Sequence, residues 1–197
     1  MNVRQWLWGL RSSGGLIAWV FLGALMSWPP LASAHHSFTY LRTADGKEAI
    51  EVIEGTVRVF RILNPHGAMI VDAAQDSDAE GWLLEMSSAA SLHREGWTDD
   101  LLSAGDAVTV SIFPSSAPNR ARLRAVLIHP KAEEEAARLM VSYGIRGDTP
   151  IMRRLRERLP VCGTITSGAR TECFVVDADA LRALETEFPG PMGYVMP

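Results

Sequence analysis

Three histidines are the residues of this chain best suited to bind a metal ion. His35 and His36 are adjacent, and His66 stands in the short sequence Asn64-Pro65-His66-Gly67. If the chain is cut after Ala34, His35 offers its α-amine and its imidazole to one ion, and His66 supplies a third nitrogen. Nitrogen-rich sets of ligands favour copper(II). The sequence therefore predicts a copper site at His35 and His66.

Copper could also bind in a second mode, which uses only the first two residues of the cleaved chain. The amine, a deprotonated backbone amide and the His36 imidazole can hold copper without help from the fold. Near the histidine loop, Glu54, Asp72 and Glu85 are the carboxylates that could orient a ligand histidine. In the alternative interpretation no metal binds: the first histidines anchor the chain on the protein and His66 hydrogen-bonds within its own turn.

A free amine at His35 requires removal of the preceding residues, and these resemble a secretory signal peptide. They combine two arginines, an apolar run at 16–26 and an Ala-x-Ala end at 32–34. The apolar run is shorter than the roughly 20 residues that cross a bilayer, and Pro29-Pro30 would break its continuation. A cleaved signal is therefore favoured over an uncleaved anchor, and export to the periplasm is predicted.

Size and charge limit the classes of function. Cleavage leaves 163 residues, enough for one core with an extension. Both removed charges are arginines, so the formal charge changes from −4 to −6. This argues against nucleic acid or anionic lipid as partners. In an exported protein, Cys162 and Cys173 are predicted to form a disulfide.

Residues 50–130 are predicted to form the small β-barrel that would position His66. Gly55, inside the first predicted strand, suggests a bend or bulge that lets one strand serve both sides of a barrel. The elements follow the order β-β-β-α-β-β of the OB-fold, whose ligands usually meet the loops after strands one and four. A β-sandwich fragment is the main alternative. Strands are predicted at 50–62, 68–72, 81–86, 107–113 and 123–128, and a helix at 87–96.

The remaining residues form an arm and an extension. Residues 35–49 read as an arm that turns at Asp45-Gly46. Residues 131–197 read as an extension packed on or tethered to the barrel, and the arginine run in its middle reads as a solvated helix face. The predicted elements of the extension are a helix at 131–140, a helix at 151–159 capped at Thr149 with Pro150 first, a hairpin about Ser167-Gly168 that sets Cys162 opposite Cys173, and a last helix at 179–187 capped by Asp177.

Several spaced motifs between residues 34 and 128 resemble one bacterial family of exported proteins of unknown function. They are His35-His36-Ser37-Phe38, Glu54-Gly55-Thr56-Val57, Asn64-Pro65-His66, Trp82 with Glu85-Met86, Gly96-Trp97 and Gly105-Asp106-Ala107-Val108-Thr109-Val110. The resemblance implies export and a small β-domain, and it implies no activity. The extension from Lys131 and the histidine at position 93 depart from the family pattern.

Nothing in the sequence points to an enzyme. The serines lack a Gly-x-Ser-x-Gly elbow, no phosphate-binding glycine loop is present, and His93 and His129 read as surface and strand-end residues. We therefore expect a periplasmic, non-enzymatic binding module that holds copper. The alternative is an envelope protein–protein interaction module whose histidines are structural.

Overall fold

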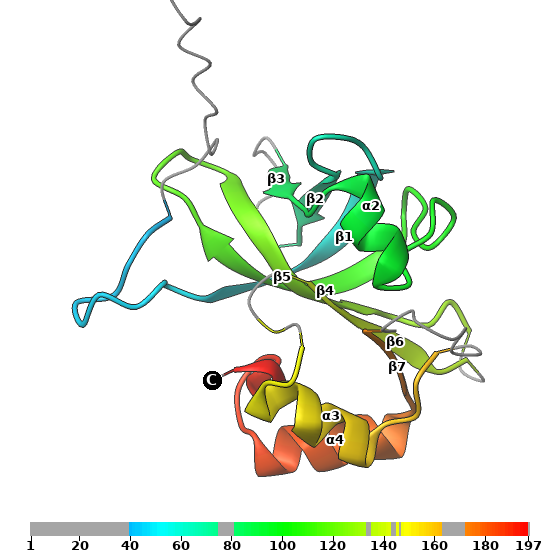
Figure 1. Cartoon of the computed structure of the whole chain (residues 1–197). Helices are drawn as coiled ribbons and strands as arrows, with labels where there is room; N and C mark the ends of the chain where they lie inside the picture. Colours follow the sequence, from blue (N-terminus) through cyan, green and yellow to red (C-terminus); the bar gives the residue numbers. More distant parts are fainter. Residues whose placement is uncertain are drawn as a thin grey trace, which may run out of the picture. The chain divides into compact units, whose positions relative to one another are not determined.

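The computed structural model (Figure 1) describes residues 40–74, 81–132, 135–142, 145, 147–162 and 172–196, which belong to the compact unit Phe38–Pro197. His35, His36 and the predicted cleavage site lie outside the described residues. The elements are β1 (Glu51–Arg61), β2 (Ala68–Ala73), β3 (Trp82–Glu85), α2 (Ala89–Arg94), β4 (Ala107–Pro114), β5 (Arg120–Ile128), β6 (Ala137–Val141), α3 (Pro150–Arg158), β7 (Cys173–Val176), α4 (Ala178–Glu187) and a 3-10 turn, η2 (Gly193–Val195).

The long strand β1 pairs with two neighbours, and the two pairings overlap at Gly55 and Thr56. Gly55 lies opposite Ala73 of β2 and also opposite Val108 of β4. A Cβ atom at this position would lie 2.1 Å from the carbonyl oxygen of Asp72. The bulge itself falls at Arg58, where the register of β1 with β2 shifts. Gly55 therefore permits close strand approach, while the bulge lies three residues further on.

A parallel pairing between β3 and β5 closes the barrel. It runs from Leu83 opposite Arg120 to Glu85 opposite Arg122, and it joins the ends of a sheet ordered β3-β2-β1-β4-β5. Alternate residues of these strands fill the interior, and Trp97 packs there against Phe60 with ring centroids 6.2 Å apart. The predicted mainly β class and the small five-stranded barrel with helical additions are confirmed. Its assignment to the OB-fold remains a prediction.

The helix predicted at 131–140 is wrong, because residues 137–141 form β6. This strand pairs with β5 from Ala125 opposite Val141 to Ile128 opposite Arg138. Met140 enters the barrel core and Leu139 enters a second core on the other face. Helix propensity is a weak preference, and burial of both faces beside an exposed strand edge outweighs it.

The extension continues the barrel sheet instead of forming a separate body. β7 pairs with β6, so the sheet has seven strands. Two helices, α3 and α4, lie side by side against the second core (Figure 1), and both were predicted with their caps. Thr149 accepts a hydrogen bond from Met152 N, and Asp177 accepts one from Ala180 N.

The arginines of α3 mostly bind within the protein. Arg158 forms an ion pair with Glu187 of α4, and Arg154 lies over the Phe188 ring at 4.1 Å. Arg153 pairs with Asp148 at 3.2 Å. Arg156 has no ion pair with another described residue. The run therefore holds the two helices together and is not a free cationic surface.

The predicted disulfide between Cys162 and Cys173 is confirmed, with the Cα atoms 5.3 Å apart. Val161 bridges to Phe174, and Cys162 N donates to Cys173 O at 2.9 Å. The two cysteines are therefore opposed across an antiparallel pair, as the predicted hairpin requires. The predicted turn at Ser167-Gly168 lies outside the described residues.

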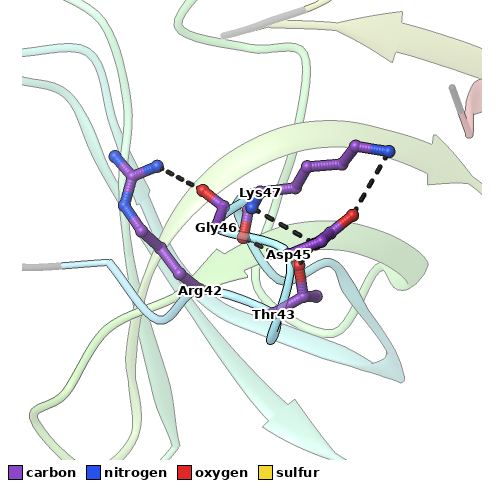
Figure 2. A network of polar contacts seen from close by, with 5 residues as sticks. All are labelled: Arg42, Thr43, Asp45, Gly46 and Lys47. Atoms are coloured by element: carbon purple, nitrogen blue, oxygen red, sulfur yellow. Dashed lines mark hydrogen bonds and ion pairs between the residues drawn. The ribbon is translucent and has the colours of Figure 1, made fainter.

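The described part of the arm forms a hairpin. Arg42 bridges to Glu48, and the chain reverses at the predicted turn, where Gly46 has a φ of 81°. Figure 2 shows the contacts of this tip: Arg42 Nη1 donates to Gly46 O at 2.7 Å, and Lys47 Nζ lies 3.4 Å from Asp45 Oδ2. The contacts of the tip all join residues of the hairpin itself, which leads into β1.

Candidate functional site

The loop after β1 presents His66 at the surface on a fixed backbone. The Asn64–Pro65 peptide bond is cis. Gly67 N donates to Ser87 O at 2.9 Å, and Met86 N donates to Gly67 O at 2.8 Å, so the loop is tied to the chain after β3. A Cβ on Gly67 would lie 2.9 Å from Leu92 Cδ1 of α2. Gly67 is buried, and His66 beside it is exposed.

Glu85 is the carboxylate that the fold brings to His66. Glu85 Oε1 lies 3.4 Å from His66 Nδ1. The histidine side chain is 40% exposed, whereas the glutamate side chain is only 10% exposed. A carboxylate beside Nδ1 favours the tautomer with its proton on Nδ1, which leaves Nε2 as a lone-pair donor. The pair therefore presents one imidazole, oriented by a carboxylate, on a side chain that is partly exposed to solvent.

The other two predicted carboxylates are not brought to His66. Asp72 is four residues beyond Ala68 on β2, and its Oδ2 accepts a hydrogen bond from Arg58 Nε at 3.0 Å. Glu54 lies seven residues before the end of β1, roughly 23 Å along the strand at about 3.3 Å per residue. These residues belong to the opposite end of the β1–β2 pair.

The arm is attached at the end of β4 by Tyr40 and Leu41, which sequence analysis did not single out as site residues. Tyr40 bridges to Ser115 after β4, and Leu41 N donates to Pro114 O at 2.8 Å. Arg122 Nη1 donates to the Tyr40 hydroxyl at 3.4 Å. Arg122 is the β5 residue opposite Glu85 of β3, so the arm and His66 lie on either side of one strand pair. Nothing in the local sequence signals that Arg122 lies beside Tyr40 and opposite Glu85, because both positions depend on closure of the barrel.

The remaining described histidines have separate surroundings. His93 Nδ1 lies 3.1 Å from Trp97 O, and His129 Nε2 lies 2.8 Å from Thr109 Oγ1. Within the described ranges, no group of three or more His, Cys, Asp or Glu side chains could hold a metal ion. In the same ranges, none of the helices has the length and apolar character needed to cross a membrane.

A second polar region surrounds Asp106 at a cavity of about 230 Å³ that His129, Lys131 and Arg138 also line. Asp106 is buried and lies 2.8 Å from Lys131 Nζ, and it accepts a hydrogen bond from Ser103 N at 2.9 Å. Burial alone would raise the pKa of the Asp106 carboxyl, but these two contacts and nearby Arg138 outweigh burial, so the pKa is lowered. The contacts join the start of β4 to the chain after β5.

This environment predicts a pH-dependent contribution to stability. A carboxyl whose pKa is lowered by folding stabilises the protein above its unfolded pKa, and this stabilisation is lost as pH falls through the folded pKa. Asp106→Asn should therefore lower the free energy of unfolding by about 1–2 kcal/mol at pH 7. The difference from the unsubstituted protein should shrink below about pH 4. Urea titrations of both proteins at several pH values measure this difference in the free energy of unfolding.

The control for this prediction is Asp179→Asn, because the Asp179 side chain is 90% exposed. It should change stability by less than about 0.5 kcal/mol at either pH. An Asp106→Asn effect that stays constant from pH 7 to pH 3 would contradict the assignment to the ionised carboxylate.

Comparison with known proteins identifies the family from the same part of the chain that carries the loop and the barrel. Residues 24–124 match the family of unknown function DUF6152. The chain belongs to this family. The DUF6152 match covers β1 to β4, His66, Glu85 and most of β5, and it ends before β6. No curated protein and no solved structure matches this DUF6152 member.

Proposed function

We propose that this protein is an exported, periplasmic, non-enzymatic module that binds copper(II) through His35 and His66. The amine and imidazole of His35, freed by cleavage after Ala34, would supply two nitrogens, and His66 Nε2 would supply the third. The observation that carries the proposal is the contact between Glu85 and His66 Nδ1, with the imidazole exposed. Metal-binding histidines commonly have a carboxylate behind the other ring nitrogen.

The place where the arm is attached supports the proposal. Pro114 accepts from Leu41, while the next residue, Ser115, donates to Arg120 of β5, so the arm lies on the edge of β4 opposite β5. From that edge to β2 there are four strand spacings, about 19 Å in all. The five residues from His35 to Tyr40 extend about 17 Å at most, and the two histidine side chains span the rest. The chain is therefore long enough to bring His35 to His66.

The test uses protein exported natively, with its first residue established by mass spectrometry. The His36→Ala background removes the local copper mode. In this background, copper(II) titration by calorimetry should show one site, and His66→Ala or one added N-terminal residue should abolish it. Glu85→Gln should weaken copper affinity by about 10-fold or more, because an orienting carboxylate is lost.

His93→Ala is the matched control, because His93 is also exposed but its Nδ1 lies 3.1 Å from a backbone carbonyl, that of Trp97, and not from a carboxylate. It should leave copper affinity unchanged. Equal binding by the parent, the His66→Ala variant and the N-terminally extended protein would overturn the proposed copper site. A mass that retains residues 1–34 would overturn the proposed export and the free amine together.

An envelope interaction module is the second candidate, and an exposed apolar side chain favours it. Leu63, in the same loop as His66, is 51% exposed. If the loop docks a partner protein, Leu63→Asp should abolish its co-purification from envelope extracts, and His66→Ala should not. If co-purification depends on His66 and copper but not on Leu63, this second candidate is wrong.

A further inference from the structure

The returning strand of the arm hairpin, which runs from Lys47 into β1, has one edge without a backbone partner among the described residues. On its other edge, Lys47 O and Ala49 N are bonded to the outgoing strand of the hairpin. Backbone groups alternate in direction along a strand, so the N–H and C=O groups of Glu48 and Ile50 point to the free edge. Glu54 of β1 has the same direction, since its carbonyl accepts from the chain after β2. We call this free edge the arm edge; an unpaired strand edge is a template for a further strand.

A second copy of the same strand fits the arm edge in antiparallel orientation and in one register. Outward residues must pair with outward residues for backbone bonds to form, so Glu48 can lie opposite Glu48, Ile50 or Val52 of the second copy. The first register brings two glutamates together, and like charges directly opposite each other destabilise a sheet. The third register leaves Lys47 opposite an apolar side chain. The second register, with Glu48 opposite Ile50, places Lys47 opposite Glu51 at both ends of the pairing.

The centre of this pairing is apolar. Ala49 would lie opposite Ala49 of the second copy on a two-fold axis, where its small side chain allows close approach. Within the hairpin, Ala49 N donates to Leu41 O at 2.9 Å, so Leu41 lies beside Ala49 on the adjacent strand. Leu41 is 43% exposed, and Leu63 is the other large apolar residue exposed to this degree in the described part of the chain. Leu41 and Ala49 of the two copies would therefore form one apolar row across the axis.

The two charges that would pair at the ends of this row are available. Glu51 is exposed and has no ion pair with another described residue. The Lys47 side chain is 81% exposed, and its Nζ lies 3.4 Å from Asp45 Oδ2 at the hairpin tip (Figure 2). An exposed pair of this kind contributes little, so Lys47 can exchange it for Glu51 of a second copy.

We propose that this protein self-associates through the arm edge, with residues 47–51 of two copies paired antiparallel about Ala49. The paired strands continue into β1 of each copy. Copper binding plays no part in this inference. Five paired residues bury much less than the roughly 1,200–2,000 Å² of a stable interface, so the dissociation constant should be on the order of 0.1–1 mM.

Cysteine cross-linking tests the register directly. Opposed residues of a pair that is not hydrogen-bonded have Cα atoms about 4.5 Å apart, within the range of a disulfide. Under a mild oxidant such as diamide, Ala49→Cys should form a covalent dimer that non-reducing electrophoresis detects. Thr43→Cys, exposed on the outgoing strand of the same hairpin, is the matched control, and it should cross-link at least about 10-fold more slowly.

Two further cysteine variants separate this register from the others. Lys47→Cys and Glu51→Cys should each remain uncross-linked alone, because equal positions lie about 13 Å apart along the paired strands. A mixture of the two variants should form the covalent dimer, since position 47 of one copy meets position 51 of the other. The mixed dimer also keeps one of the two ion pairs.

Sedimentation equilibrium of metal-free protein tests the charges. The average mass of the parent protein should rise with concentration. Lys47→Glu and Glu51→Lys should each weaken association about fivefold or more, because each change places like charges opposite each other. The double variant Lys47→Glu/Glu51→Lys should restore association, since it only exchanges the two ends of the pairing. Arg156→Glu, on the exposed face of α3, is the matched control and should leave association unchanged.

Each contrary outcome is specific. A parent protein that stays monomeric up to about 1 mM would overturn self-association. Ala49→Cys that cross-links no faster than Thr43→Cys would overturn pairing at the arm edge. Cross-linking of Lys47→Cys with itself, or a double charge variant as weak as the single ones, would overturn the register. Because these experiments contain no copper, their failure leaves the proposed copper site standing, and failure of the copper site leaves this inference standing.

Discussion

Gly55→Ala is expected to lower the free energy of unfolding by at least about 3 kcal/mol, at the upper end of the range for overpacked sites. The new Cβ would lie 2.1 Å from Asp72 O and 2.8 Å from Asp72 C. Both atoms belong to the backbone of β2, which is held in register with β1, so no side-chain rotation relieves the contact. Thermal unfolding followed by circular dichroism should show a midpoint lower by about 6–12 °C.

The direction of this change is informative by itself. A glycine replaced by alanine where the backbone can accept it usually stabilises a protein by about 0.4–1 kcal/mol, because the unfolded chain loses freedom. Thr56→Ala, at the exposed next position of β1, is the control and should change stability by less than about 1 kcal/mol. A Gly55→Ala protein as stable as the parent would contradict the close approach of β1 and β2.

The barrel strands could be predicted from local pattern because their alternation and their β-branched residues are visible in the sequence itself. Alternation predicted β1 and β4, and the caps at Thr149 and Asp177 predicted α3 and α4. Residues 131–140 could not be predicted in this way. Their composition favours a helix, and the strand at 137–141 depends on the edge of β5, which exists only after the barrel has formed.

The candidate site also combines residues that could be predicted locally with residues that depend on the pairing of distant strands. His66 and Glu85 could both be selected from the sequence, since residue type and nearness to the loop were enough. Choosing Glu85 over Asp72 required the register of β2 with β3, in which Ala68 lies opposite Glu85. Arg122 required the parallel closure of β3 on β5. Pairings between distant segments thus decide which of several plausible side chains meet.

The position of the second core explains why the extension should not be treated as removable. Leu127 of β5 faces this core, while Val126 beside it faces the barrel interior. In β7, Phe174 lies in the second core and its neighbour Cys173 reaches the first. Deleting residues 131–197 would expose Leu127 and open the barrel core at Met140. Loss of a partner in such a deletion could not be separated from loss of the fold.

A substitution within the second core tests whether the extension and the barrel unfold as one unit. Phe174→Ala has the largest expected effect. Phe174 is fully buried, and its removal should lower the free energy of unfolding by about 3–5 kcal/mol. After cleavage at Ala34 the protein keeps two tryptophans, Trp82 and Trp97, and both pack in the barrel core. If the two cores unfold together, the urea midpoint measured by tryptophan fluorescence should fall as far as the midpoint measured by circular dichroism.

The comparison is decisive because Phe174 and the tryptophans belong to different cores. A separate extension would lose stability on its own, and the tryptophan midpoint of Phe174→Ala would equal that of the parent protein; this result would contradict the single seven-stranded sheet. Arg156→Ala, on the exposed face of α3, is the control and should move neither midpoint by more than the equivalent of about 0.5 kcal/mol. Coincident shifts in Phe174→Ala would mean that β6 and β7 stabilise the barrel that carries His66, so the extension supports the candidate site without contacting it.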